Sequence, residues 1–237
     1  MLAASLERIS SALAQDALVL DVGGGANPVS RADWVLDIMP YADRGLYGDF
    51  DAATERFDAS TWVIRDMCDH EPWPFADDQF DFAVCSHTLE DIRDPVWVCR
   101  ELIRVARAGY VEVPSRLEEQ SYGLCGEFVG WPHHRWLVDV VGDRVGFVVK
   151  PAILPIDERY FFPEGFVDGL ESEERVQRLF WEGGFEYRER IFTKPGDFSD
   201  YLSGFVAAEM AKRGIARPRQ PFRRAFRWLR KRTRFRV

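Results

Sequence analysis

The chain has 237 residues, of which 46% are hydrophobic and 14% aromatic, enough for one globular domain with a sizeable core. No apolar run reaches the length of a membrane-spanning helix, which excludes an integral membrane protein. The four cysteines form no C-x-x-C pair, which excludes a disulfide scaffold and indicates reduced structural residues of a cytoplasmic protein.

Charge is divided unevenly along the chain. Residues 217–237 hold ten of the 31 basic residues and no acidic one, so residues 1–216 carry 21 basic against 39 acidic groups. An acidic body is a poor docking surface for nucleic acid, because phosphate binding needs clustered Lys and Arg.

The basic tail, residues 217–237, has a helical pattern of its own. Phe222, Phe226, Leu229 and Thr233 share one face among Arg and Lys residues, which predicts a basic amphipathic helix. Such a helix would attract anionic head groups at the inner face of the membrane. A clamp on the acidic body and a solubilising disordered end are the alternatives.

The first two predicted elements are a surface helix and a buried strand. Leu2, Leu6 and Ile9 recur at helical spacing, which favours a helix packed on a sheet over a signal peptide. The apolar run 19–22 then ends in three glycines, where a ligand can approach the bare backbone. A ligand site at the carboxyl end of this strand is therefore predicted.

The glycine loop does not fit a dinucleotide. A G-x-G-x-x-G fingerprint fails because Pro28 stands at the last glycine, and residues 29–34 leave room for roughly one turn of helix. The loop suits a ligand with a carboxylate, an amine and a ribose. Asp37 ends the next strand, where its carboxylate can accept hydrogen bonds from ribose hydroxyls.

Strands and helices alternate through the middle of the chain. Asp94 and Pro95 are typical of a helix start, and Gly109 is expected to end that helix. Four more strands are predicted at 34–37, 61–65, 81–85 and 110–113. This alternation predicts a parallel, doubly wound α/β sheet.

The carboxyl-terminal part is predicted to carry an insertion. Residues 114–160 contain a β-hairpin, 136–141 and 144–150, which would overhang the ligand site and recognise the substrate. A helix, a strand and a further helix are expected at 171–181, 185–193 and 200–213. Residues 1–216 are thus expected to form one domain, with 217–237 as its tail.

The motifs of residues 15–115 resemble those of class I S-adenosylmethionine-dependent methyltransferases, in the small-molecule, type 11-like branch. Asp21-x-Gly23-x-Gly25 followed by Asp37 is similar to motif I and its acidic successor, and the run 75–92 is similar to the branch's fourth-strand motif. This sequence departs from the family's pattern at Asn27, where many members have a glycine, at Asp91, where a histidine is common, and in its short first helix.

This resemblance implies a Rossmann-like, mostly parallel, seven-stranded sheet and S-adenosylmethionine as cofactor. It implies cofactor contacts from Asp21, Gly23, Gly25, Asn27, Asp37, Asp66, Met67, Ser86 and His87. Without the family, Asp66 at a strand end would be interpreted as an N-cap or a loop-stabilising acid.

Methyl transfer to a hydroxyl needs a base as well as alignment of donor and acceptor. His133 and His134 lie beside tryptophans in the insertion, and His134 is the preferred base; a hydrogen-bonding polar loop is the alternative. No spacing demands a metal, although a divalent cation such as Mg²⁺ could bind one of these histidines with carboxylates from Glu90, Asp91, Glu112, Glu118 and Glu119.

The leading hypothesis is O-methylation of a sugar, a lipid-linked glycan or another small molecule. A nucleic-acid or protein methyltransferase that docks through its basic tail is one alternative. A non-catalytic module that keeps the methyltransferase fold is the other.

Overall fold

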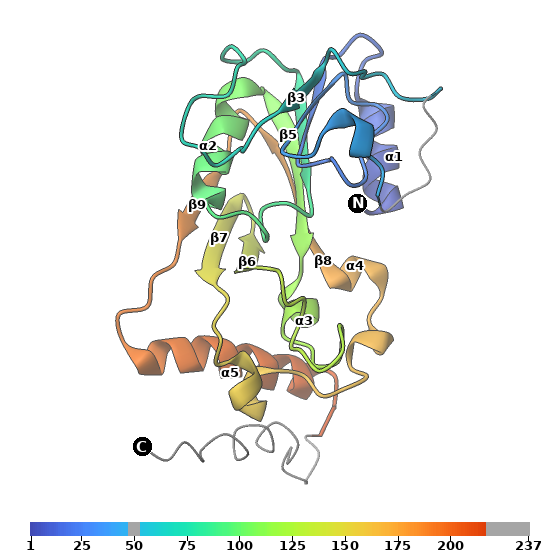
Figure 1. The fold of residues 1–237 in the computed structure, drawn as a ribbon. Coiled ribbons are helices and arrows are strands. Elements are labelled where there is room, and N and C mark those ends of the chain that lie inside the picture. The colour runs from blue at the N-terminus through green and yellow to red at the C-terminus, as the bar shows by residue number, and fades with distance from the viewer. Residues whose placement is uncertain (47–52, 217–237) are drawn as a thin grey trace, which may run out of the picture.

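The main sheet has six strands in a computed structural model that describes residues 1–46 and 53–216 (Figure 1). The strand order is β3-β2-β1-β4-β5-β8; all neighbours are parallel except β5 and β8. Its strands are β1 (Val19–Val22), β2 (Trp34–Asp37), β3 (Trp62–Ile64), β4 (Phe82–Ser86), β5 (Ala108–Pro114) and β8 (Val176–Glu182). The predicted mostly parallel α/β sheet is confirmed.

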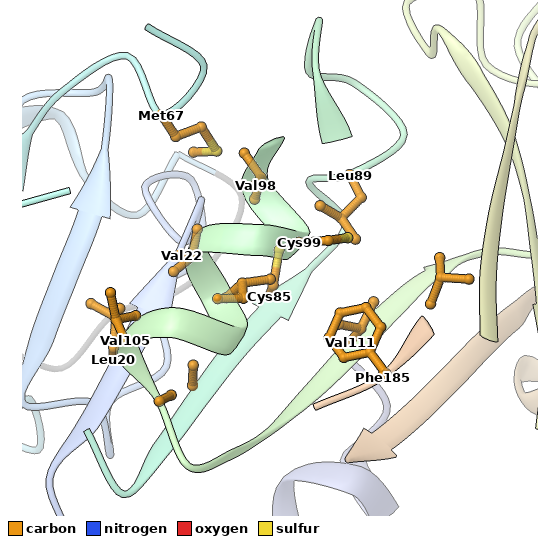
Figure 2. Packing of buried hydrophobic residues seen from close by; sticks show 14 of the residues in the cluster. Leu20, Val22, Met67, Cys85, Leu89, Val98, Cys99, Val105, Val111 and Phe185 are labelled. Atoms are coloured by element: carbon orange, nitrogen blue, oxygen red, sulfur yellow. The ribbon is translucent and has the colours of Figure 1, made fainter. Parts of the chain in front are cut away.

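Two helices cover opposite faces of this sheet. On one face α1 (Ala3–Ala12) inserts Ile9 against Val19 and Val35. On the other face lies α2 (Pro95–Val105), and Figure 2 shows its Val98 and Cys99 packed with sheet residues such as Val22. Successive residues of a strand point to opposite faces of the sheet. Because α1 covers one face and α2 the other, β1 and β4 are buried on both faces, and most of their residues are apolar.

The predicted hairpin is confirmed as part of a second, three-stranded sheet. It comprises β6 (Trp136–Val141), β7 (Arg144–Val149) and β9 (Glu186–Glu189), with β9 parallel to β7. Its apolar residues Val138, Val145 and Phe147 extend the core beneath α2. Seven strands were expected in the main sheet; six are present among the described residues, because β9 joins the hairpin.

The prediction of a helix at 171–181 is wrong beyond its first turn. The helix α4 (Ser172–Arg175) ends where β8 begins, and β8 pairs antiparallel with β5 over seven residue pairs. Leu179 and Trp181 enter the core under α2, whereas Phe180 packs against the opposite core. The open edge of β5 therefore decides the conformation of this segment.

Gly109 was expected to end α2 and instead lies within β5. A Cβ atom at this position would stand 2.5 Å from both the Ala83 carbonyl oxygen and the Trp181 ring. Glycine is thus needed for the close packing of Trp181 on the sheet, and α2 ends earlier, at Val105.

The remaining helices are short except for α5 (Pro195–Lys212), which includes most of the predicted helix 200–213. It contacts the turn after β5, where Arg116 of α3 (Arg116–Glu119) donates to the Tyr201 carbonyl at 2.9 Å. Four 3₁₀ helices complete the described part: η1 (Tyr41–Asp43), η2 (Leu154–Ile156), η3 (Glu158–Tyr160) and η4 (Val167–Gly169). None of the helices in the described ranges is long and apolar enough to span a bilayer.

Candidate functional site

A cavity of about 1000 Å³ opens where β1, β2 and β4 end, and the insertion forms part of its wall. Nine predicted site residues line it: Asp21, Gly23, Asn27, Asp37, Met67, Ser86, His87, His133 and His134. Gly25 and Asp66 are not part of this lining. The structure thus brings the glycine loop and the insertion histidines to one cavity.

The glycine loop is held by a buried carboxyl group and by a close contact. Asp21 accepts a hydrogen bond from the Val29 N–H at 2.8 Å, and burial raises the pKa of Asp21 to about 7 despite that bond. Gly23 has φ +77°, and a Cβ atom there would stand 2.3 Å from the Thr88 side chain. A larger residue would therefore displace the loop from the end of β4.

Asp37 ties the loop to β2. Its two carboxylate oxygens accept hydrogen bonds from the Gly25 N–H at 2.9 Å and the Met39 N–H at 2.7 Å. A Cβ atom at Gly25 would stand 2.7 Å from this carboxylate, so Gly25 allows the close approach instead of lining the cavity. Each oxygen keeps a lone pair for a further donor, and ribose binding by Asp37 stays a prediction.

Asp66 is engaged outside the cavity lining. Its carboxylate lies 2.7 Å from an Arg93 nitrogen and accepts a hydrogen bond from the Cys68 N–H at 2.9 Å. These are the interactions of a loop-stabilising acid. That is one of the two roles expected for Asp66 when the resemblance to methyltransferases is set aside. Met67 does line the cavity, and contact of either residue with adenine stays a prediction.

His87 and Glu112 form an ion pair where β4 and β5 run side by side. His87 Nε2 lies 3.1 Å from Glu112 Oε1. Burial favours neutral Glu112, but hydrogen bonds from His87, Tyr110 and the Leu2 N–H outweigh it and lower the pKa of Glu112 to about 2. Burial likewise opposes a charged His87, yet Glu112 and Glu90 raise the pKa of His87 to about 9. His87 is therefore a cation at neutral pH and a poor general base.

The insertion places its histidines over the cavity through contacts with the segment after β4. The Arg135 N–H donates to the Glu90 carbonyl at 2.7 Å, and the Trp136 indole N–H donates to the Ile92 carbonyl at 2.8 Å. His134 Nδ1 then lies 2.6 Å from Glu119 Oε1. Burial lowers the pKa of His134, but Glu119 more than offsets this, and the net shift is upward.

The five carboxylates considered for Mg²⁺ do not form one cluster. Glu112 pairs with His87, and Glu118 accepts from the Trp131 indole N–H at 2.7 Å and from Arg175 at 2.6 Å. Glu119 lies 2.6 Å from Lys150 Nζ as well as from His134. Glu90 and Asp91 also line the cavity. Neither carboxylate oxygen of Glu90, nor Oδ1 of Asp91, has a hydrogen-bond partner among the described residues.

Sequence reasoning missed Thr88 and the residues directly after Asp37 in the cavity lining. Ile38 and Met39 could have been found from the rule that ligands bind beyond the carboxyl ends of parallel strands. Thr88 carries no such signal, because its contact with Gly23 depends on how β4 lies beside β1.

The family model described as "Methionine biosynthesis protein MetW" matches residues 3–116, just under half of the chain. Solved structures are similar at low identity: YcgJ of Bacillus subtilis is 18% identical, with a TM-score of 0.38, over 47% of this chain and 51% of that one. The SAM-dependent methyltransferase from Aquifex aeolicus is 16% identical, with a TM-score of 0.35, over 47% and 64%. That from Mesorhizobium loti is 15% identical, with a TM-score of 0.36, over 62% and 64%.

The chain spans less than two thirds of each of these structures, and at such identities and TM-scores they carry no inference about activity. No curated protein matches the chain. The family match covers the glycine loop, Asp37 and the first five strands of the sheet, the segment whose motifs carried the resemblance. This amino-terminal half is therefore similar to the MetW family, in the same segment whose motifs resemble those of the class I S-adenosylmethionine-dependent methyltransferases.

Proposed function

We propose that the chain binds S-adenosylmethionine in the cavity and transfers its methyl group to a hydroxyl of a sugar, a glycan or another small molecule. One observation carries the proposal: the glycine loop and the histidines of the insertion line the same cavity. Donor and acceptor sites that share one cavity are what a direct methyl transfer requires.

The reaction is an in-line displacement at the methyl carbon. The bond from sulfur to the methyl carbon breaks and its electron pair returns to sulfur, which leaves neutral S-adenosylhomocysteine. A bond from the acceptor oxygen to the methyl carbon forms, and the hydroxyl proton is released. Ser86 and His87 at the end of β4 would stand nearest the donor's methionine part, and His133 and His134 would face the acceptor.

The acceptor end of the cavity favours a polar ring. Trp131 is on the cavity wall, and its indole N–H is held by Glu118 at 2.7 Å. An aromatic face fixed in this way suits stacking against a pyranose, while neighbouring carboxylates and imidazoles can bind hydroxyls. The basic tail would hold a cytoplasmic enzyme at the inner face of the membrane, where a lipid-linked acceptor is accessible.

The first test is calorimetric titration of the full chain with S-adenosylhomocysteine, with NAD⁺ as the ligand control. We expect binding of the first ligand only, weakened at least tenfold in Asp37→Ala, because a hydrogen bond to a charged group contributes about 1.5–3 kcal/mol. Asp143→Ala, at the exposed hairpin turn, is the matched control and should bind normally. Absence of binding in a protein that unfolds cooperatively would contradict the proposal.

The two rival functions give different results. A non-catalytic module would bind S-adenosylhomocysteine and transfer no label from S-adenosylmethionine to any glycan or small-molecule hydroxyl. A nucleic-acid methyltransferase would form a salt-sensitive RNA complex that is lost when residues 217–237 are deleted. The excess of acidic residues in 1–216 argues against that second outcome.

A further inference from the structure

Three potential metal ligands from two distant segments meet on the cavity wall. Asp91 follows β4, whereas His133 and His134 belong to the insertion. One ligand atom from each of the three lies within 4.8 Å of the other two, and His134 Nε2 is 3.9 Å from Asp91 Oδ1. A movement of roughly an ångström would bring all three to the 2.0–2.2 Å metal distances of such ligands.

His134 already has the orientation of a metal-ligating histidine. Its Nδ1 lies 2.6 Å from the buried carboxylate of Glu119, whose other oxygen is 2.6 Å from Lys150 Nζ. Histidines that bind metals usually donate one ring N–H to a carboxylate, which fixes the ring and presents the other nitrogen. Here the presented nitrogen is Nε2, on the side of Asp91.

A second observation comes from Glu90, the residue that precedes Asp91. Glu90 is 1% exposed and lines the cavity, yet neither of its carboxylate oxygens has a hydrogen-bond partner among the described residues. Glu90 Oε1 lies 3.6 Å from His87 Nδ1, an ion-pair distance longer than a hydrogen bond. Asp91 Oδ1 is also buried and without a hydrogen bond. A buried carboxylate that lacks hydrogen bonds, such as that of Glu90, is costly to bury, and a nearby divalent ion would offset part of that cost.

We propose that Asp91, His133 and His134 bind a divalent transition metal of the Zn²⁺ type at the acceptor end of the cavity. Two imidazoles and one carboxylate suit Zn²⁺ or Co²⁺, whereas Mg²⁺ prefers oxygen ligands alone. The sequence-based set of five carboxylates for Mg²⁺ is thereby replaced by a smaller set with two nitrogen ligands. Three protein ligands leave a coordination position for a hydroxyl oxygen.

The role of the ion rests on the proposed function. A hydroxyl bound at the open position becomes more acidic, as metal-bound water does. Its proton passes to solvent water in the cavity, and its oxygen forms the new bond to the methyl carbon. The sulfur of the donor retains the electron pair of the broken bond, so charge and atoms balance.

The test uses the untagged full chain and Co²⁺ alone, whose binding is followed by visible absorption. We expect one Co²⁺ per chain, displaced by Zn²⁺, with affinity weakened at least tenfold in Asp91→Asn and in exposed His133→Ala. The matched control is His70→Ala, because His70 is 60% exposed, pairs with Asp94 and lies outside the cavity lining. That variant should bind Co²⁺ normally.

The outcomes separate this site from the proposed function. Absence of stoichiometric Co²⁺ binding, or binding that persists unchanged in Asp91→Asn and His133→Ala, overturns the metal site. Titration of the same samples with S-adenosylhomocysteine reports on the cofactor site independently. Metal binding without S-adenosylhomocysteine binding would therefore keep the metal site and overturn the methyltransferase function.

Discussion

At the scale of single residues, the pair of His87 and Glu112 links the end of β4 to β5 and stands beside the cavity. Glu112 is 1% exposed and gathers donors from His87, Tyr110 and Leu2, so its negative charge is well compensated. His87 has φ +53° and keeps 43% of its side chain exposed. The contribution of this pair to stability is consequently modest and depends on pH.

Replacing His87 should remove a pH dependence of stability. The pKa of folded His87 is about 9 against an ordinary value of 6.5, so its contribution is complete below pH 6.5 and is lost as pH rises through 9. His87→Asn suits the positive φ. Urea unfolding at pH 6 and 9.5 should show that the wild type loses about 1 kcal/mol more than this variant, after discounting for exposure. Equal losses in both proteins would contradict the pairing.

At the scale of elements, the small sheet β6-β7-β9 is part of the main core. Phe147 of β7 is fully buried together with Val138 and Val145, in the cluster that includes α2 and β8. The hairpin thus cannot shift without disturbing the core that it shares with α2 and β8. That packing holds the start of β6, and with it His133 and His134, against the segment after β4.

Truncation of the hairpin's core residue should destabilise the whole domain. We expect Phe147→Ala to lower the free energy of unfolding by about 3–5 kcal/mol, the usual cost of a cavity of this size. Val149→Ala on the same strand, at a side chain 53% exposed, should change it by no more than about 0.5 kcal/mol. Urea denaturation measures both. Similar small effects of the two changes would mean that the hairpin folds separately from the core.

At the scale of the whole molecule, an acidic body is joined to a strongly basic tail. The membrane contact predicted from that tail falls on residues 217–237, which lie outside the described part of the chain. Ten basic groups near an anionic surface would contribute on the order of 1 kcal/mol each, which far exceeds what the acidic body would lose by repulsion at a distance.

Deletion of residues 217–237 should abolish membrane association. In co-sedimentation with vesicles rich in phosphatidylserine, we expect the full chain to bind and the deletion variant to bind at least a hundredfold more weakly, with the loss reproduced by high salt. Vesicles of neutral phosphatidylcholine are the lipid control, and an unchanged urea unfolding curve is the control for folding. Equal binding of both proteins to the anionic vesicles would remove the membrane role.

The first five strands and the glycine loop were predictable from the sequence because their signals are local. Buried parallel strands are continuous apolar runs, and Gly142 with Asp143 between alternating residues marks the hairpin turn. The position of Asp37 at a strand end likewise follows from the pattern around it. For these features the local conformation depends on residues that are close in sequence.

Other features were decided only by the tertiary structure, because they depend on segments far apart in the chain. The conformation of 176–182 was set by the free edge of β5, which overrode a helical pattern. The engagement of Asp66 with Arg93, and the meeting of His134 with Glu119 and Asp91, arise when the insertion and the segment after β4 fold together. Local patterns thus specify the strands of the main sheet and the glycine loop, whereas long-range packing determines which polar groups of the insertion and of the segment after β4 face one another.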